Sequence, residues 1–280
     1  MKSITLLKVS GSSLIGYQLI NQSTYQLVNL LLPISPSKMK IAIAQTNPVK
    51  GNIDMNIRDH VSLVRLAIAE GAGTIIFPEL SLTGYEPSLA AKLATSQDDE
   101  RLFVFQELST THQLIICVGL PIAMKKGTSI GMVIFQPGAE RQTYLKKYLH
   151  ADEEPFFISG ELFTGPIGNP PGMALAICYE ISIPAHAANA SACGASVFLA
   201  SVAKSVTGMD KSIETLSGIA SHYSMTVLMS NCTGHCDDFE CGGKSSIWND
   251  KGILVGQLGA SDEGILLIDT VTGQVISQVL

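Results

Sequence analysis

The segment that decides the fold class is residues 40–77, KIAIAQTNPVKGNIDMNIRDHVSLVRLAIAEGAGTIIF. The short apolar run at 40–46 predicts a strand, and the β-branched run at 74–77 predicts another. Between them, apolar residues at spacings of four, three and four predict one face of a helix that ends near Gly71. These residues are Ile57, Val61, Val64 and Ile68. A strand, a helix and a strand in this order favour a layered α/β fold over an all-α or all-β one.

The same alternation continues to the C-terminus. Further helices are expected at 98–111, 184–192 and 209–223. Further strands are expected at 114–118, 129–135, 140–149, 173–177, 195–201, 226–231, 245–248 and 264–269. No internal repeat, low-complexity tract or linker divides residues 39–280, so we expect a single domain there.

The first 38 residues differ in composition from the rest of the chain. They hold scattered Leu and Ile among many Ser, Asn and Gln, and Pro33 and Pro36 stand just before Met39, which opens directly into the first strand. A secretory signal is disfavoured, because Lys8 interrupts the apolar region and no clean small-residue cleavage site comes after it. We expect translation to start at Met39, with residues 1–38 a disordered or dispensable extension.

Composition and charge exclude several classes of protein. The chain has 280 residues, of which 46% are apolar and 15% charged, so it can bury a large core and is not a disordered protein. The net charge is -6 without a basic stripe, which disfavours nucleic-acid and anionic-membrane partners. Six scattered cysteines are too few for a disulfide scaffold, and no apolar stretch approaches the roughly 20 residues of a membrane span, so a reducing cytoplasm is expected.

Three reactive side chains come directly after predicted strands or near their ends. Glu79 follows the strand at 74–77, Cys178 follows the strand at 173–177, and Lys146 lies on or near the end of the strand at 140–149. Catalytic groups collect at strand ends in open α/β sheets. A free thiol is only about a few per cent ionised at neutral pH, so a base within hydrogen-bond reach of Cys178 would activate it.

The three segments resemble the signature motifs of the carbon-nitrogen hydrolase (nitrilase) superfamily, in the same order along the chain. The first is Phe77-Pro78-Glu79-Leu80-Ser81-Leu82-Thr83-Gly84-Tyr85. The second is Tyr144-Leu145-Lys146-Lys147-Tyr148-Leu149, continuing to Glu153, Phe157 and Gly160. The third is Leu175-Ala176-Ile177-Cys178-Tyr179-Glu180, with Pro184 after it. The resemblance covers essentially everything from Met39 onward.

This resemblance implies a four-layer αββα sandwich, assembly into homodimers or larger homo-oligomers, and no cofactor. It also implies that Glu79 is the general base, Lys146 the electrophilic stabiliser and Cys178 the nucleophile. A supporting second glutamate falls at Glu153, with Glu154 as the rival if the loop shifts. Many relatives have Arg where this chain has Leu145 and His where it has Tyr148; these departures bear on substrate fit.

The resemblance further implies a substrate class and leaves alternatives open. Nitrilases of the superfamily typically carry Trp after the cysteine, whereas Tyr179 resembles the amidase branches, so cleavage of a small-molecule amide with release of ammonia or an amine is favoured. The backbone N–H of Tyr179 and the ammonium of Lys146 would hold the oxyanion, on the way to a thioester on Cys178. Nitrile hydrolysis, acyl transfer on the same site and a catalytically silent binding protein remain alternatives.

Other residues have simpler interpretations. A papain-like pairing of Cys178 with His186 or His150 lacks a supporting local pattern. The cluster Cys232, His235, Cys236 and Cys241 lies in one Gly- and Asp-rich loop, unlike the two separated ligand pairs of zinc motifs, so no metal site is expected. The default for His60, His112 and His222 is a surface or capping role, and that for Trp248, the single tryptophan, is the core.

Overall fold

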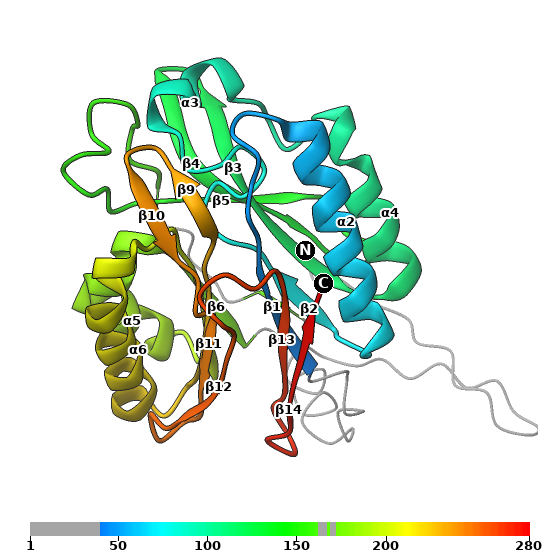
Figure 1. The fold of residues 1–280 in the computed structure, drawn as a ribbon, viewed down its shortest axis with the longest axis vertical. Coiled ribbons are helices and arrows are strands. Elements are labelled where there is room, and N and C mark those ends of the chain that lie inside the picture. Colours follow the sequence, from blue (N-terminus) through cyan, green and yellow to red (C-terminus); the bar gives the residue numbers. More distant parts are fainter. Residues whose placement is uncertain (1–39, 162–166, 169–171) are drawn as a thin grey trace, which may run out of the picture. The chain divides into compact units, whose positions relative to one another are not determined.

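The computed structural model describes residues 40–161, 167–168 and 172–280 (Figure 1). The expected extension at 1–38 lies outside the described residues. None of the helices in these ranges is both long and apolar enough to cross a membrane.

The first sheet has seven strands in the order β14-β13-β1-β2-β3-β4-β5. Their bounds are β1 Lys40–Gln45, β2 Thr74–Ile76, β3 Ile115–Met124, β4 Gly127–Phe135, β5 Gln142–Leu145, β13 Gly264–Asp269 and β14 Val275–Val279. β1, β2 and β3 are parallel, and antiparallel strands extend the sheet on both sides.

The second sheet has five strands in the order β12-β11-β8-β7-β6. Their bounds are β6 Met173–Ile177, β7 Val197–Ser201, β8 Thr226–Ser230, β11 Ser246–Trp248 and β12 Leu254–Gln257. β6, β7 and β8 are parallel, and β11 and β12 are added antiparallel. A separate hairpin is formed by β9 (Thr233–Cys236) and β10 (Phe239–Gly242).

Helices cover the outer faces of the two sheets, which gives the expected αββα arrangement (Figure 1). The helices are α2 Ile53–Ala69, α3 Pro87–Leu93, α4 Phe103–His112, α5 Pro184–Ala192 and α6 Met209–Tyr223, with 3₁₀ turns η1 Glu100–Leu102, η2 Cys178–Ser182 and η3 Val206–Gly208. α2 and α4 pack on the first sheet, and α6 packs on the second.

Period-two alternation in the strands separates the layers of the core. In β1, Ala42 and Ala44 join the apolar cluster that lies beneath α2 and α4, whereas Ile41 and Ile43 join a second cluster with residues of β6, β7 and β8. Because both faces of the central strands are buried, these strands read as nearly continuous apolar runs. Trp248, at 1% exposure, belongs to the second cluster, which confirms its expected place in the core.

Two serine hydroxyls join the sheets at the ends of their parallel strands. Ser201 Oγ donates to the Phe77 carbonyl at 2.8 Å, and Ser230 Oγ donates to the Ala44 carbonyl at 2.6 Å. Ser201 is in register with Ile177, the residue before Cys178, and Phe77 lies two residues before Glu79. The Ser201 bond therefore holds the end of β2 beside the ends of β6 and β7, and the Ser230 bond joins the ends of β1 and β8.

Several predictions of local structure are wrong in detail. The buried face of α2 is rotated from the expected one and includes the polar residues Asn56 and His60. His60, expected at the surface, is 1% exposed and stacks on the Phe77 ring at 4.0 Å between centroids. Its Nδ1 donates to the Asn56 carbonyl and its Nε2 accepts from Ser81 Oγ at 2.8 Å, so the neutral ring supports the chain just after Glu79.

Candidate active site

Glu79 lies in a tight turn directly after β2. The carbonyl of Pro78 packs so closely on β3 that a Cβ at Gly119 would come within 2.5 Å of it, which explains why a glycine occurs there. Leu80, the next residue, has a left-handed backbone conformation with φ of 50°. This geometry directs Glu79 inward, where it is 2% exposed.

Lys146 is the first residue after β5, which ends earlier than the expected strand at 140–149. Its side chain is fully buried and its Nζ donates to Glu79 Oε1 at 2.7 Å and to Glu153 Oε1 at 2.6 Å. Glu153 is 1% exposed and Glu154 is exposed, so the structure places Glu153 and not its rival beside Lys146. One ammonium thus lies between two buried carboxyl groups.

Glu153 is held by two further donors. Tyr85 OH donates to Glu153 Oε1 at 3.1 Å, and the backbone N–H of His150 donates to Oε2 at 2.8 Å. Sequence reasoning quoted Tyr85 within the first motif but gave it no role. This hydrogen bond joins the last residue of the first motif, Tyr85, to the carboxylate of Glu153 in the continuation of the second motif.

Cys178 comes directly after β6 and is the first residue of the 3₁₀ turn η2. Its backbone is left-handed, with φ of 44°. Residues other than glycine adopt this conformation at a cost in free energy, and it often marks a functional site. The residue keeps 8% exposure, compared with 2% for Glu79 and 0% for Lys146. Tyr179 comes next in the turn, where the first N–H groups have no partner within a helix.

Glu180 joins the segments that carry Lys146 and Cys178. It is fully buried, and its carboxylate accepts from the backbone N–H groups of Lys147 and Ile177, each at 2.8 Å, and from Tyr144 OH at 2.5 Å. Sequence reasoning missed this role. The available signal was an acidic residue two positions after the candidate nucleophile, in a segment that otherwise reads as buried.

Burial and neighbouring charges shift the pKa values of the site. Burial raises the pKa of Glu79 to about 7; the charge of Lys146 opposes this shift and that of Glu153 adds to it. Burial and the Glu79 charge raise the pKa of Cys178 to about 11, while Lys204 and Lys146 act in the opposite sense. Burial alone would lower the pKa of Lys146, but the charges of Glu79, Cys178 and Glu153 raise it, so Lys146 remains an ammonium.

These pKa values define what the three groups can do together. With a pKa of about 11, only about one Cys178 thiol in 10⁴ is ionised at pH 7, so the thiol needs a base. Glu79 Oε2 is buried and forms no hydrogen bond of standard geometry with the part of the chain that the structure describes, and the Cys178 thiol is near enough to act on the pKa of Glu79 as a donor. Catalytic hydrogen bonds of this kind often tighten only when substrate binds.

The histidines of the papain-like alternative have other partners. His186 is buried, and its Nε2 donates to the Leu175 carbonyl at 2.9 Å. His150 is exposed and its Nδ1 contacts Asp152. Within the described ranges, neither imidazole is hydrogen-bonded to Cys178.

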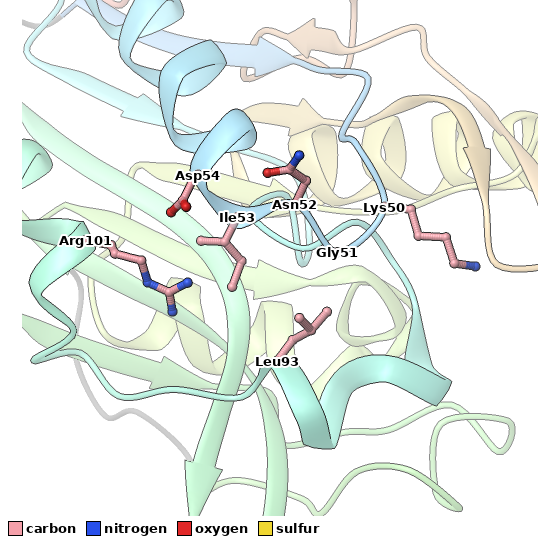
Figure 2. Close-up of a pocket in the computed structure, with 7 residues that line it drawn as sticks. All are labelled: Lys50, Gly51, Asn52, Ile53, Asp54, Leu93 and Arg101. Carbon is pink, nitrogen blue, oxygen red and sulfur yellow. The ribbon is translucent and has the colours of Figure 1, made fainter.

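A surface pocket of about 410 Å³ lies elsewhere, at the start of α2 (Figure 2). Lys50, Asp54 and Arg101 are among the residues around it. It contains none of Glu79, Lys146 and Cys178, and we do not assign the reaction to it.

The cysteine-rich segment after β8 is a hairpin and not the expected loop. It brings the sulfurs of Cys232, Cys236 and Cys241 within 4.8 Å of one another, a set of atoms that could hold a metal ion. His235, the fourth member of the cluster, is directed outward, with 70% of its side chain exposed.

Known proteins share both the sequence pattern and the fold. The sequence model of the family described as Carbon-nitrogen hydrolase matches residues 40–278. Among curated proteins, the chain is 24% identical over 242 residues to a glutamine-dependent NAD(+) synthetase of Thermotoga maritima, covering 83% of this chain and 42% of that protein. A protein of the same name from Rhodobacter capsulatus is 23% identical over 245 residues, covering 84% and 44%. The chain thus spans less than half the length of these relatives.

Solved structures of an amidase from Nesterenkonia sp. AN1 share the fold. One, a mutant with the acetamide moiety of fluoroacetamide added covalently at its active-site cysteine, superposes with a TM-score of 0.74 at 21% identity, over 86% of this chain and 95% of that one. Another, in complex with butyramide, gives a TM-score of 0.73 at 22% identity, over 87% and 96%.

Proposed function

Because the chain belongs to the carbon-nitrogen hydrolase family, we propose that it hydrolyses the amide C–N bond of a small molecule through a thioester on Cys178. The observation that carries the proposal is the convergence of Glu79 and Lys146 from the first sheet with Cys178 from the second. The Lys146 ammonium is 2.7 Å from Glu79 Oε1, and both act on the pKa of Cys178.

In the first half of the reaction, Glu79 takes the proton of the Cys178 thiol as the sulfur attacks the amide carbon. The carbonyl π electrons move to oxygen, and the resulting oxyanion is stabilised by the Lys146 ammonium and the Tyr179 N–H. Glu79, now protonated, gives its proton to the amide nitrogen as the C–N bond breaks. Ammonia or a small amine leaves, and the acyl group remains on the sulfur.

In the second half, Glu79 removes a proton from water as the water oxygen attacks the thioester carbon. The tetrahedral intermediate then expels the Cys178 sulfur, which recovers the proton from Glu79, and the carboxylic acid is released. A carboxyl group with a pKa of about 7 suits both directions of this transfer, since general acid–base catalysis is most effective when the pKa lies near the working pH.

Lys146 differs from the other two groups because its protons stay in place. Two buried carboxyl groups hold it at 2.7 and 2.6 Å, and the raised pKa keeps it charged throughout the cycle. Its position between Glu79 and Glu153 gives a fixed positive charge where negative charge appears in the transition state. The second carboxyl, Glu153, balances that charge and orients the ammonium.

The decisive experiment is ammonia release from small amides, carbamoyl compounds and nitriles. Wild-type protein should release ammonia from at least one amide, and Cys178→Ala should abolish it. Denaturing mass spectrometry of a rapidly quenched reaction should show the acyl group as added mass on the peptide that contains Cys178. Undiminished turnover in Cys178→Ala would refute the mechanism. Loss of one iodoacetamide label per chain in Cys178→Ala, counted beside the label on the exposed Cys193, would distinguish a reactive enzyme from a silent binding protein.

The relatives suggest two substrate classes within this proposal. Two relatives that each cover more than four fifths of this chain are named glutamine-dependent synthetases, which favours the side-chain amide of glutamine as the ammonia source. The structural neighbour was solved with butyramide, which favours an aliphatic amide. Comparing kcat/KM for glutamine, butyramide and acetamide in one assay separates the two, and nitrile turnover or acyl transfer to hydroxylamine tests the remaining alternatives.

A further inference from the structure

Three cysteines that the proposed reaction does not use converge in the interior. Cys232 precedes β9, Cys236 ends it and Cys241 lies in β10. The Cys232 sulfur is 2.8 Å from that of Cys241 and 3.9 Å from that of Cys236. The three residues are 1%, 1% and 3% exposed, so the sulfurs form a closed cluster away from solvent.

The cluster offers one cation three soft ligand atoms. The sulfurs of all three side chains lie within 4.8 Å of one another, so a single ion placed between them could reach each of them. Cysteine sulfur is a ligand that zinc(II) and copper(I) bind in proteins. The arrangement of the hairpin therefore brings together the ligand set of a thiophilic metal ion.

We propose that Cys232, Cys236 and Cys241 bind one soft, thiophilic d¹⁰ metal ion, with zinc(II) and copper(I) as the ions to be tested. Binding would replace the protons of those sulfurs that are still thiols, which are released, and would form three metal–sulfur bonds. With metal–sulfur bonds of about 2.3 Å, ligand sulfurs lie about 3.8 Å apart. The separation of 3.9 Å between Cys232 and Cys236 fits this geometry, and Cys232 and Cys241 would separate by about 1 Å.

The number of ligands bears on which ion fits better. Among the described residues, this group offers three sulfurs and no fourth side chain. Zinc is almost always four-coordinate in structural sites and would need an additional ligand, whereas copper(I) is stable with three thiolates. Thiolate ligands disfavour hard cations such as magnesium and calcium.

The position of the cluster connects it to both halves of the candidate active site. The backbone of Tyr85, whose hydroxyl binds Glu153, contacts Cys236. On the other side, Gly242 N–H donates to the Lys204 carbonyl at 2.8 Å, and the charge of Lys204 lowers the pKa of Cys178. A bound ion would therefore fix the hairpin that spans from the Tyr85 loop to the Lys204 loop.

The test uses the full chain, reduced and freed of metal, and does not depend on turnover. Zinc(II) and copper(I) are titrated separately in competition with a chromophoric chelator. We expect one equivalent of at least one ion to bind, with affinity reduced roughly 100-fold or more in Cys236→Ser and Cys241→Ser. Cys117→Ser, a buried cysteine outside the cluster, and Cys193→Ser, an exposed one, are matched controls that should bind as the wild type does.

A second measurement works on the wild-type protein alone, in case a variant does not fold. Cobalt(II), used as a probe for zinc, should give intense near-ultraviolet charge-transfer absorption whose strength scales with the number of thiolate ligands. Absence of stoichiometric binding of both zinc(II) and copper(I), or equal affinity in Cys236→Ser, would overturn the proposal. A purified protein with a mass two hydrogens lower and two thiols missing would also overturn it, because it would identify the cluster as a disulfide. Each result is independent of ammonia release, so it leaves the proposed function to its own test.

Discussion

Replacing Lys146 by methionine tests the buried charge arrangement at the centre of the site. Methionine has a similar length and no charge, so the change leaves Glu79 and Glu153 facing each other without the ammonium between them. Lys146 is fully buried and donates two charged hydrogen bonds, at 2.7 and 2.6 Å. Breaking a buried ion pair by removing one partner costs about 3–5 kcal/mol, because the remaining charge has no compensation.

The loss should depend on pH in a defined direction. Without Lys146 nothing opposes the effect of burial on Glu79, so the pKa of Glu79 rises further, its carboxyl group is neutral in acid, and the penalty appears as the pH increases and Glu79 is forced to ionise. We expect the free energy of unfolding of Lys146→Met to fall below that of the wild type by about 3–5 kcal/mol at pH 8, and by clearly less at pH 5. For a domain of this size, the loss at pH 8 corresponds to a Tm lower by about 6–20 °C.

Urea unfolding at the two pH values, monitored by circular dichroism, measures the effect. Lys147→Met is the matched control, since this neighbouring side chain is only partly buried and should lose less than about 1 kcal/mol. A loss under about 1 kcal/mol for Lys146→Met at pH 8, or one that is equal at pH 5 and pH 8, would contradict the buried arrangement of one cation between two carboxyl groups.

Three other variants test the remaining contacts. The kcat/KM of the wild type should rise with an apparent pKa of about 7, because Glu79 loses its proton there. Glu79→Gln should be at least about 100-fold slower and should not show this rise. A wild-type kcat/KM that is constant from pH 5 to 9 would exclude Glu79 as the base. Because burial raises the pKa of Glu79, the free energy of unfolding of the wild type should fall by about 3 kcal/mol as the pH rises from 4.5 to 7. Urea unfolding of Glu79→Gln, which has no carboxyl group to ionise, should not show this fall. Glu180→Gln should lose about 1–3 kcal/mol of stability in the same assay, because the single amide oxygen cannot accept all the hydrogen bonds that two carboxylate oxygens accept now. The variant should also slow the alkylation of Cys178 by iodoacetamide. An unchanged alkylation rate would show that Glu180 contributes to stability and not to the position of Cys178. Tyr85→Phe should cost about 1 kcal/mol and lower kcat less than tenfold, since Lys146 still holds Glu153; complete inactivation would show that Tyr85 has a larger role.

The sequence was sufficient to predict the layered fold because periodicity survives where strands and helices are buried. The bounds of β6, β13, α5 and α6 match the expected ranges. Short elements were missed or misjudged: α3 and the β9–β10 hairpin were not expected, and β5 ends four residues before the expected strand does. Their polar positions carry no clear period, and their bounds are decided by tertiary contacts, such as the Glu180 carboxylate that accepts from Lys147 N–H.

The sequence motifs were the source of the three predicted residues of the candidate site. Order along the chain and strand ends singled out Glu79, Lys146 and Cys178, and the structure brings the first two into contact and couples both to the third. The choice between Glu153 and Glu154 needed coordinates, because neighbouring residues in a turn face in different directions. The proximity of the cysteine sulfurs also needed coordinates, since a hairpin brings residues 232 and 241 together although nine positions separate them.

The hydroxyl of Ser201 joins the two sheets beside Glu79 and Cys178, the groups that we propose as base and nucleophile. Ser201 pairs in register with Ile177, the residue before Cys178, and its hydroxyl donates to the carbonyl of Phe77, two residues before Glu79. The separation between the Glu79 carboxyl group and the Cys178 sulfur is therefore set by main chain and one short side chain, not by the loops that would meet a substrate. Natural variation in those loops can therefore alter which molecule is accepted while leaving the attack distance untouched. For the same reason, changes meant to alter the accepted substrate should begin at the loops, since shortening side chains between the sheets would change the distance between the proposed base and the proposed nucleophile.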